Sequence, residues 1–193
     1  PWRIRDFKKA DALLTILPFE RSWYEAHGAP ATYVGHPLGD CATSMDPLPE
    51  SLAALTDGVW VGLLPGSRRR EVEENLPLLM QAAKKLHQEI PEAQFVLPHL
   101  RPEIYPFIQE LLSQAEFPIL FAKGEFQSVL PHLQGAWVTS GTAVLEVAAH
   151  KVPPILVYHL SSRWKEWLSR RWLSVPWIGG LNLLAGEQLA PEH

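Results

Sequence analysis

The sequence predicts an α/β fold, a Rossmann-like parallel sheet with helices on both faces. Short apolar runs rich in branched residues alternate with longer amphipathic segments, which is the pattern of such a sheet. Turns containing glycine and hydroxyl residues also follow two of the apolar runs, where α/β proteins place their ligands. With 193 residues, 47% of them hydrophobic, the chain can bury a core.

Seven strands and six helices are expected along the chain. The strands are predicted at 12–17, 31–35, 59–64, 94–98, 118–122, 136–140 and 154–158. The helices are predicted at 20–27, 69–89, 103–115, 126–133, 142–150 and 162–172. The helix over 69–89 is the clearest, because apolar residues recur on one face at three- and four-residue steps.

The segment 41–57 is predicted to be a linker, since 46–49 (DPLP) is rich in turn residues and lacks any periodicity. It separates a short strand–helix–strand unit, 1–40, from a larger Rossmann-like unit, 58–193. The chain starts without methionine or a signal-peptide pattern, and no closing helix follows 185–187. We therefore expect a fragment that is truncated at its C-terminal end.

Composition excludes several classes of protein. The net charge of -4 argues against nucleic acid as a partner. A lone cysteine, Cys41, excludes an internal disulfide and a multi-cysteine zinc site, and it favours a reducing compartment such as the cytoplasm. The longest apolar runs are far shorter than the roughly 18 residues that a membrane span needs.

The turn between strand 59–64 and helix 69–89 carries Gly66, Ser67 and Arg68, followed by two further arginines. The glycine allows a ligand to approach the backbone, and the helix start offers free N–H groups to a phosphate. Arg68 would add bidentate contacts to a diphosphate. Alternatively, Ser67 is only an N-cap and the arginines are solvated. Three cations oppose the helix dipole, which favours a nearby anion.

A second turn of this kind, containing Ser140, Gly141 and Thr142, follows strand 136–140 and opens a helix. It faces the same edge of the sheet, so the two turns predict a cleft. Its amides and hydroxyls would hold phosphate, and Glu146, one turn into the helix, would accept hydrogen bonds from ribose hydroxyls. The alternative for Glu146 is a favourable interaction with the helix dipole.

Together with these turns, three further segments resemble the lipid-A-disaccharide synthases: 16–20 (ILPFE), 33–38 (YVGHPL) and 181–186 (LNLLAG). The resemblance covers nearly the whole chain. It implies one half of a GT-B glycosyltransferase fold, with 1–40 as the end of the acceptor-side domain and crossover, and 58–193 as the nucleotide-sugar-binding domain.

The resemblance also implies an activity. The family joins UDP-2,3-diacylglucosamine to 2,3-diacylglucosamine 1-phosphate with inversion, releasing UDP, in lipid A biosynthesis. By analogy Arg68, 140–142, Glu146 and Asn182 bind the donor, and His36 is a weaker candidate. The general base would lie in the family's N-terminal domain, so the fragment alone should be inactive. Gly179 and Gly180 precede Leu181 and Asn182, where the family has proline before the asparagine.

The residues leave two other functions open. One is another UDP-GlcNAc enzyme, such as a 2-epimerase or a peptidoglycan-type transferase, and the other is a non-catalytic nucleotide-sugar-binding module. No cofactor or metal is expected, because no acidic or histidine cluster has ligand spacing. The segment 161–177 interleaves tryptophans with basic residues. It predicts either contact with a membrane surface or a helix packed on the sheet. The expected location is the cytoplasm, peripheral at the inner membrane, with a homodimer left open.

Overall fold

The computed structural model describes residues 4–38, 47, 49, 52–53, 58–139, 141–157 and 179–192. The chain divides into two compact units, Pro1–Thr43 and Ser44–His193. Each unit has its own sheet.

The smaller unit is a parallel strand–helix–strand motif preceded by a short helix. It contains α1 (Ile4–Phe7), β1 (Leu13–Thr15), α2 (Pro18–Ala26) and β2 (Ala31–Tyr33). The two strands pair in parallel, with Leu13 opposite Ala31. Helix α2 starts at a proline, whose fixed φ suits the first helical position, and Glu20 accepts a hydrogen bond from the Leu17 N–H at 3.2 Å.

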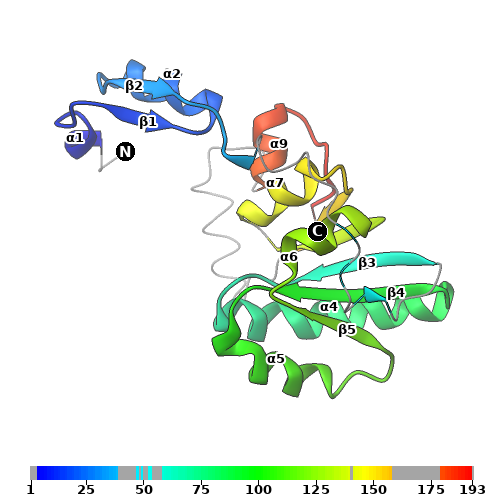
Figure 1. Ribbon diagram of the computed structural model, residues 1–193. Helices are drawn as coiled ribbons and strands as arrows, with labels where there is room; N and C mark the ends of the chain where they lie inside the picture. Colours follow the sequence, from blue (N-terminus) through cyan, green and yellow to red (C-terminus); the bar gives the residue numbers. More distant parts are fainter. Residues whose placement is uncertain are drawn as a thin grey trace, which may run out of the picture. The chain divides into compact units, whose positions relative to one another are not determined.

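The larger unit is built on a five-stranded, fully parallel sheet in the order β5-β4-β3-β6-β7 (Figure 1). Its strands are β3 (Val59–Leu64), β4 (Ala93–His99), β5 (Ile119–Lys123), β6 (Gly135–Val138) and β7 (Pro154–Leu156). The chain moves outward in one direction through β4 and β5 and then returns to the other side of β3. The strand order therefore reverses between β3 and β6, where α/β sheets open a crevice.

Helices cover both faces of this sheet, as predicted. On one face, α4 (Arg69–Glu89) and α5 (Tyr105–Leu112) pack on β3 and β4. On the other face lie α6 (Phe126–Val129), the 3-10 turn η3 (Leu130–His132) and α7 (Thr142–Ala149). Because strand side chains alternate, Phe95 and Leu97 join the first core while Val96 joins the second.

The predicted elements agree closely with the structure, but two predicted helices are divided and two short helices were not predicted. The predicted helix 126–133 consists of α6 and the 3-10 turn η3. All seven strands occur in the described residues, and α4 has the predicted bounds. The predicted helix 103–115 is divided into the 3-10 turn η2 (Pro102–Ile104) and α5, because Pro106 has no N–H to extend a preceding helix. Helix α1 and α9 (Gly180–Ala185) were not predicted. The predicted helix 162–172 lies outside the described residues.

The predicted linker 41–57 is described only in part. Leu52, inside it, is fully buried in the core on the α7 face of the sheet. At least this residue therefore belongs to the larger unit rather than to an exposed connection.

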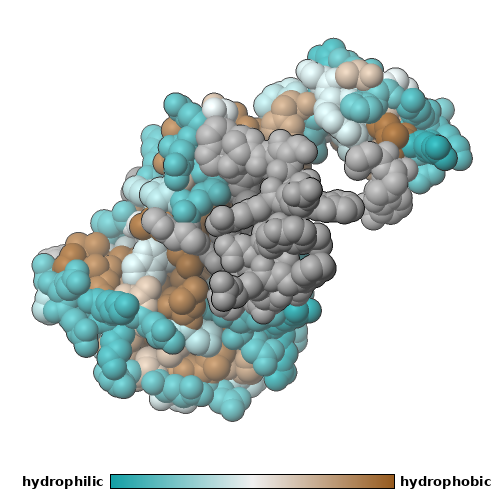
Figure 2. Space-filling model, turned by 180° about the vertical axis from the view of Figure 1, so that it is seen from behind, coloured by the Kyte–Doolittle hydropathy of each residue, from teal (hydrophilic) through white to brown (hydrophobic). Residues whose placement is uncertain are grey.

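The surface of the larger unit is mixed. Figure 2 shows hydrophilic residues interspersed with separate hydrophobic areas on the face seen from behind. None of the helices in the described part of the chain is long and apolar enough to cross a membrane.

Candidate functional site

The turn after β3 depends on a glycine. Gly66 has φ +110°, a conformation that side-chain-bearing residues rarely adopt. A Cβ at this position would lie 2.7 Å from both Cβ and Oε2 of Glu71. Glycine therefore allows the first turn of α4 to lie directly against the loop.

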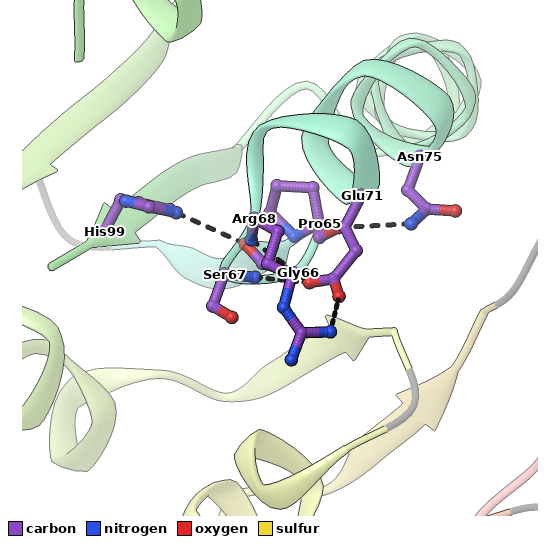
Figure 3. Close-up of polar contacts among 7 residues, drawn as sticks. All are labelled: Pro65, Gly66, Ser67, Arg68, Glu71, Asn75 and His99. Atoms are coloured by element: carbon purple, nitrogen blue, oxygen red, sulfur yellow. Dashed lines mark hydrogen bonds and ion pairs between the residues drawn. The ribbon is translucent and has the colours of Figure 1, made fainter. Parts of the chain in front are cut away.

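The Glu71 carboxylate occupies the start of α4. Its Oε2 accepts hydrogen bonds from the backbone N–H groups of Ser67 at 2.9 Å and Arg68 at 3.1 Å (Figure 3). Its Oε1 lies 3.0 Å from Nη1 of Arg68. The sequence alone leaves the amides at this helix start open to a phosphate, whereas the structure fills two of them with an internal carboxylate. A ligand phosphate at these two amides would have to displace Glu71.

The rest of the turn is held through its carbonyl groups. Asn75, one turn further along α4, donates from Nδ2 to the Pro65 oxygen at 3.2 Å. His99, at the end of β4, places Nε2 3.2 Å from the Gly66 oxygen. Figure 3 shows these contacts arriving on different sides of the loop. The backbone of 65–68 is thus held from two separate elements.

Arg68 remains accessible despite its ion pair. Its side chain is 75% exposed, and only Nη1 contacts Glu71 in the described residues. The guanidinium therefore has further donors to offer a ligand. Arg70 is almost equally exposed, at 74%, but pairs with Glu74 instead. That hydrogen bond, together with the Glu74 charge, raises the pKa of Arg70.

The turn after β6 is anchored to β3 through Thr139. Thr139 is buried, and both its N–H (3.0 Å) and its hydroxyl (3.3 Å) donate to the Leu64 oxygen. Gly141 follows with φ +141°, and apart from its chain neighbours no atom of the described residues lies within 4 Å of where its Cβ would be. It precedes the first residue of α7, Thr142, and no side chain caps this helix start in the described residues. Ser140 lies outside the described residues.

Glu146 is held by a neighbouring helix. Gln127, on α6, donates from Nε2 to Oε2 of Glu146 at 2.7 Å. The Oε1 atom of the same amide lies 3.2 Å from Nε2 of His150, one turn further along α7. One oxygen of the Glu146 carboxylate is therefore engaged by the protein.

These parts surround one cavity of about 480 Å³ at the carboxyl ends of β3, β4 and β6. Three groups of residues line it: 64–68 with Glu71, 98–101, and Thr139, 141–143 and Glu146 with Phe126. Of the predicted site residues, the cavity brings together the following: Gly66, Ser67, Arg68, Gly141, Thr142 and Glu146. The predicted cleft between the two turns is present in the structure.

Asn182 and His36 are not among the described residues that line this cavity. Asn182, on α9, is fully buried. Its Nδ2 donates to the Ala190 oxygen and to Glu192, while its Oδ1 accepts from the N–H groups of Leu189 and Ala190. Its polar atoms therefore hold the C-terminal loop. His36 belongs to the smaller unit, where its Nδ1 accepts from the Leu38 N–H at 3.2 Å.

Glu71, His99 and Gln127 are site residues that the sequence patterns did not single out. Glu71 stands three residues after the N-cap Arg68, where a capping box has its glutamate, but the sequence has arginine rather than serine or threonine at the N-cap and so lacks the usual signal. His99 directly follows a predicted strand, at the edge where ligands bind. Nothing local indicates Gln127. No cluster of three or more potential metal ligands occurs among the residues that the structure describes.

Comparison with known proteins agrees with this interpretation. A family model described as lipid-A-disaccharide synthetase matches residues 1–193. The lipid-A-disaccharide synthase of Pseudomonas putida KT2440 is 35% identical over 184 residues, covering 94% of this chain and 49% of that protein. The chain thus spans about half the length of the curated relatives it matches.

Solved structures show the fold. The Staphylococcus aureus MnaA structure, determined with UDP, has a TM-score of 0.61 at 15% identity and covers 92% of this chain and 50% of that one. The pneumococcal O-GlcNAc transferase GtfA, with UDP and GlcNAc, has a TM-score of 0.51 at 14% identity, covering 84% and 33%. The predicted fold, one half of a GT-B fold, is confirmed. Since the family model spans every residue, the chain belongs to the lipid-A-disaccharide synthase family.

Proposed function

We propose that this chain is the nucleotide-sugar-binding half of an inverting glycosyltransferase. The enzyme would join UDP-2,3-diacylglucosamine to 2,3-diacylglucosamine 1-phosphate, forming lipid A disaccharide and UDP. The observation that carries this proposal is that Arg68, Thr142 and Glu146 line the same cavity in a chain of this family. A 2-epimerase or a peptidoglycan-type transferase is a weaker alternative, because the family match covers residues 1–193.

The diphosphate would lie between Arg68 and the start of α7. The departing UDP carries negative charge, and fixed donors that face this charge lower the barrier to transfer. Arg68 supplies an exposed guanidinium, and the first amides of α7 follow a glycine without a side-chain cap in the described residues. The start of α4 is less suitable, because Glu71 already occupies two of its amides.

The ribose would lie beside Glu146. A carboxylate accepts hydrogen bonds only, which suits two neighbouring hydroxyl donors. Gln127 engages Oε2 of Glu146 and so limits the directions in which the carboxylate can turn. The hydroxyl of Ser140 and the side chain of Asn182 are proposed as donor contacts from the sequence resemblance alone.

Further parts of the proposal concern the whole enzyme. The acceptor would be an acylated glucosamine phosphate, and the general base is expected in the part of the family that this chain does not span. No metal or cofactor is expected, and nucleic acid is not expected as a partner. Contact with the cytoplasmic face of the inner membrane is assigned to 161–177, outside the described residues. A homodimer is left open.

Calorimetry tests nucleotide binding directly. We expect the 193-residue chain to bind UDP more tightly than ADP or NAD, without transferring sugar by itself. Arg68→Ala should weaken UDP binding by about 1.5–3 kcal/mol, the contribution of a charge-assisted hydrogen bond. Arg70→Ala is the matched control, since Arg70 is as exposed as Arg68 but does not line the cavity. Equal effects of the two substitutions on UDP affinity would show that Arg68 is not part of the binding site.

A further inference from the structure

His99 connects the loops around the cavity. It is the last residue of β4, has 5% of its surface exposed and lines the cavity. Its Nδ1 accepts a hydrogen bond from the Arg101 N–H at 3.1 Å, and its Nε2 lies 3.2 Å from the Gly66 oxygen. Its own carbonyl accepts from the Gly124 N–H and from the Tyr105 hydroxyl, both at 2.9 Å. The residue therefore contacts the turns after β3, β4 and β5.

The two ring contacts determine the form of the imidazole. A backbone N–H can only donate, so Nδ1 must present a lone pair to Arg101. A carbonyl oxygen can only accept, so Nε2 must carry the proton that faces Gly66. The neutral ring protonated at Nε2 satisfies both contacts, whereas a doubly protonated ring would direct Nδ1–H against the Arg101 N–H. Burial lowers the pKa of His99 from its ordinary value and so favours the neutral ring.

One peptide plane is held at both ends by this arrangement. The Gly66 oxygen and the Ser67 N–H belong to the same planar peptide unit and point in opposite directions. His99 donates to the oxygen, and Glu71 accepts from the N–H. The plane follows a glycine with φ +110°, which would otherwise have wide conformational freedom. The next residue is Arg68.

We propose that His99, as the neutral ring protonated at Nε2, is a positioning residue that fixes the Gly66–Ser67 peptide and so directs Arg68 at the nucleotide diphosphate. The effect on the nucleotide rests on the proposed function, but the effect on the loop does not. His99 itself need not touch the ligand.

The proposal predicts a dependence on pH. A proton on Nδ1 of His99 repels the Arg101 N–H and displaces the ring from its place between Arg101 and Gly66. Nucleotide affinity should therefore fall when the pH drops below the range in which histidine ordinarily titrates. The charged or titratable groups around the ring are Arg101 and Glu103 on its own turn, Tyr105 and Lys123 beside it, and Arg68 and Glu71 on the facing turn. A phosphate group also titrates near pH 6, so each variant must be compared with the unchanged chain at the same pH.

Two conservative variants separate the contacts. The amide of His99→Gln reaches the place of Nε2 and can still donate to the Gly66 oxygen. The amide of His99→Asn reaches only the place of Nδ1, so that bond is lost. We expect His99→Gln to bind UDP within about threefold of the unchanged chain and His99→Asn about tenfold more weakly, since one hydrogen bond is worth roughly that factor. His99→Gln should also lack the extra loss of affinity at acidic pH.

Nitrogen NMR tests the ring without any ligand. At neutral pH, His99 should be protonated at Nε2 only. His87 is an internal control, because its Nδ1 lies 3.3 Å from the Ala93 carbonyl and must therefore carry a proton. His87→Gln should leave UDP affinity unchanged, as this residue is not among those lining the cavity. Melting curves establish that the variants are folded.

Amide hydrogen exchange at Ser67 reports on the loop itself. His99→Asn should raise its exchange rate, and His99→Gln should leave it nearly unchanged. If the unchanged chain binds no UDP, the proposed function fails, and the exchange rates still decide whether His99 holds the loop. A proton on Nδ1 of His99 at neutral pH, or equal exchange at Ser67 in the two variants, would overturn the proposal.

Discussion

Replacing Gly66 by alanine should destabilise the larger unit by more than backbone strain alone. An L-residue in a left-handed conformation costs about 1–2 kcal/mol. At φ +110° the new Cβ would also lie 2.7 Å from Cβ and Oε2 of Glu71. Part of this contact is with the stem of the side chain, so rotation of the carboxylate cannot relieve it. The first turn of α4 has to move.

That movement removes the hydrogen bonds of Glu71 to the Ser67 and Arg68 amides. Each bond contributes about 0.5–1.5 kcal/mol, so Gly66→Ala should cost about 2–5 kcal/mol in all. Gly186→Ala is the matched control, because Gly186 has φ +72° and, its chain neighbours aside, no atom in the part of the chain that the structure describes lies within 4 Å of the place of the new methyl group. It should cost only the strain, about 1–2 kcal/mol.

Urea denaturation followed by circular dichroism measures both free energies of unfolding. The reasoning requires Gly66→Ala to cost at least 1 kcal/mol more than Gly186→Ala, as expected for about one lost hydrogen bond or more. Equal costs would show that the loop adapts without disturbing Glu71. The packing account of the turn would then be wrong.

Three further predictions concern the other parts of the chain. Glu146→Gln should weaken UDP binding and leave pyrophosphate binding unchanged, as measured by calorimetry; a parallel loss for both ligands would make Glu146 structural. Asn182→Ala should reduce the free energy of unfolding by about 2–4 kcal/mol, since buried partners lose their hydrogen bonds. A loss of UDP affinity as large as that of Arg68→Ala would support the proposed contact of Asn182 with the sugar donor, whereas unchanged UDP affinity would make Asn182 a structural residue only. Tryptophan fluorescence should shift to the blue when anionic vesicles are added at low salt. The double variant Arg170→Glu, Arg171→Glu should abolish this shift, because basic residues contribute about 1 kcal/mol each at such a surface. An unchanged spectrum would exclude membrane contact by 161–177.

Much of the fold follows from local pattern. The repeat of Val72, Leu76 and Leu79 predicts α4 with its observed bounds, and β3 is likewise predicted at 59–64. Both signals depend on residues close in sequence, because helices and strands present a face at a fixed period. The same is true of the glycine turns after β3 and β6, which a parallel sheet brings to one edge.

The tertiary structure alone decides which partner each polar group takes. The amides at the start of α4 are open to a phosphate as far as the sequence shows, yet Glu71 accepts two of them. Asn182 matches a family segment, but its amide holds the loop that contains Leu189 and Ala190. His99 meets Gly66 across 33 positions of the chain. Hydrogen bonds depend on distances of about 3 Å between groups, and such distances exist only once the sheet has brought distant segments together.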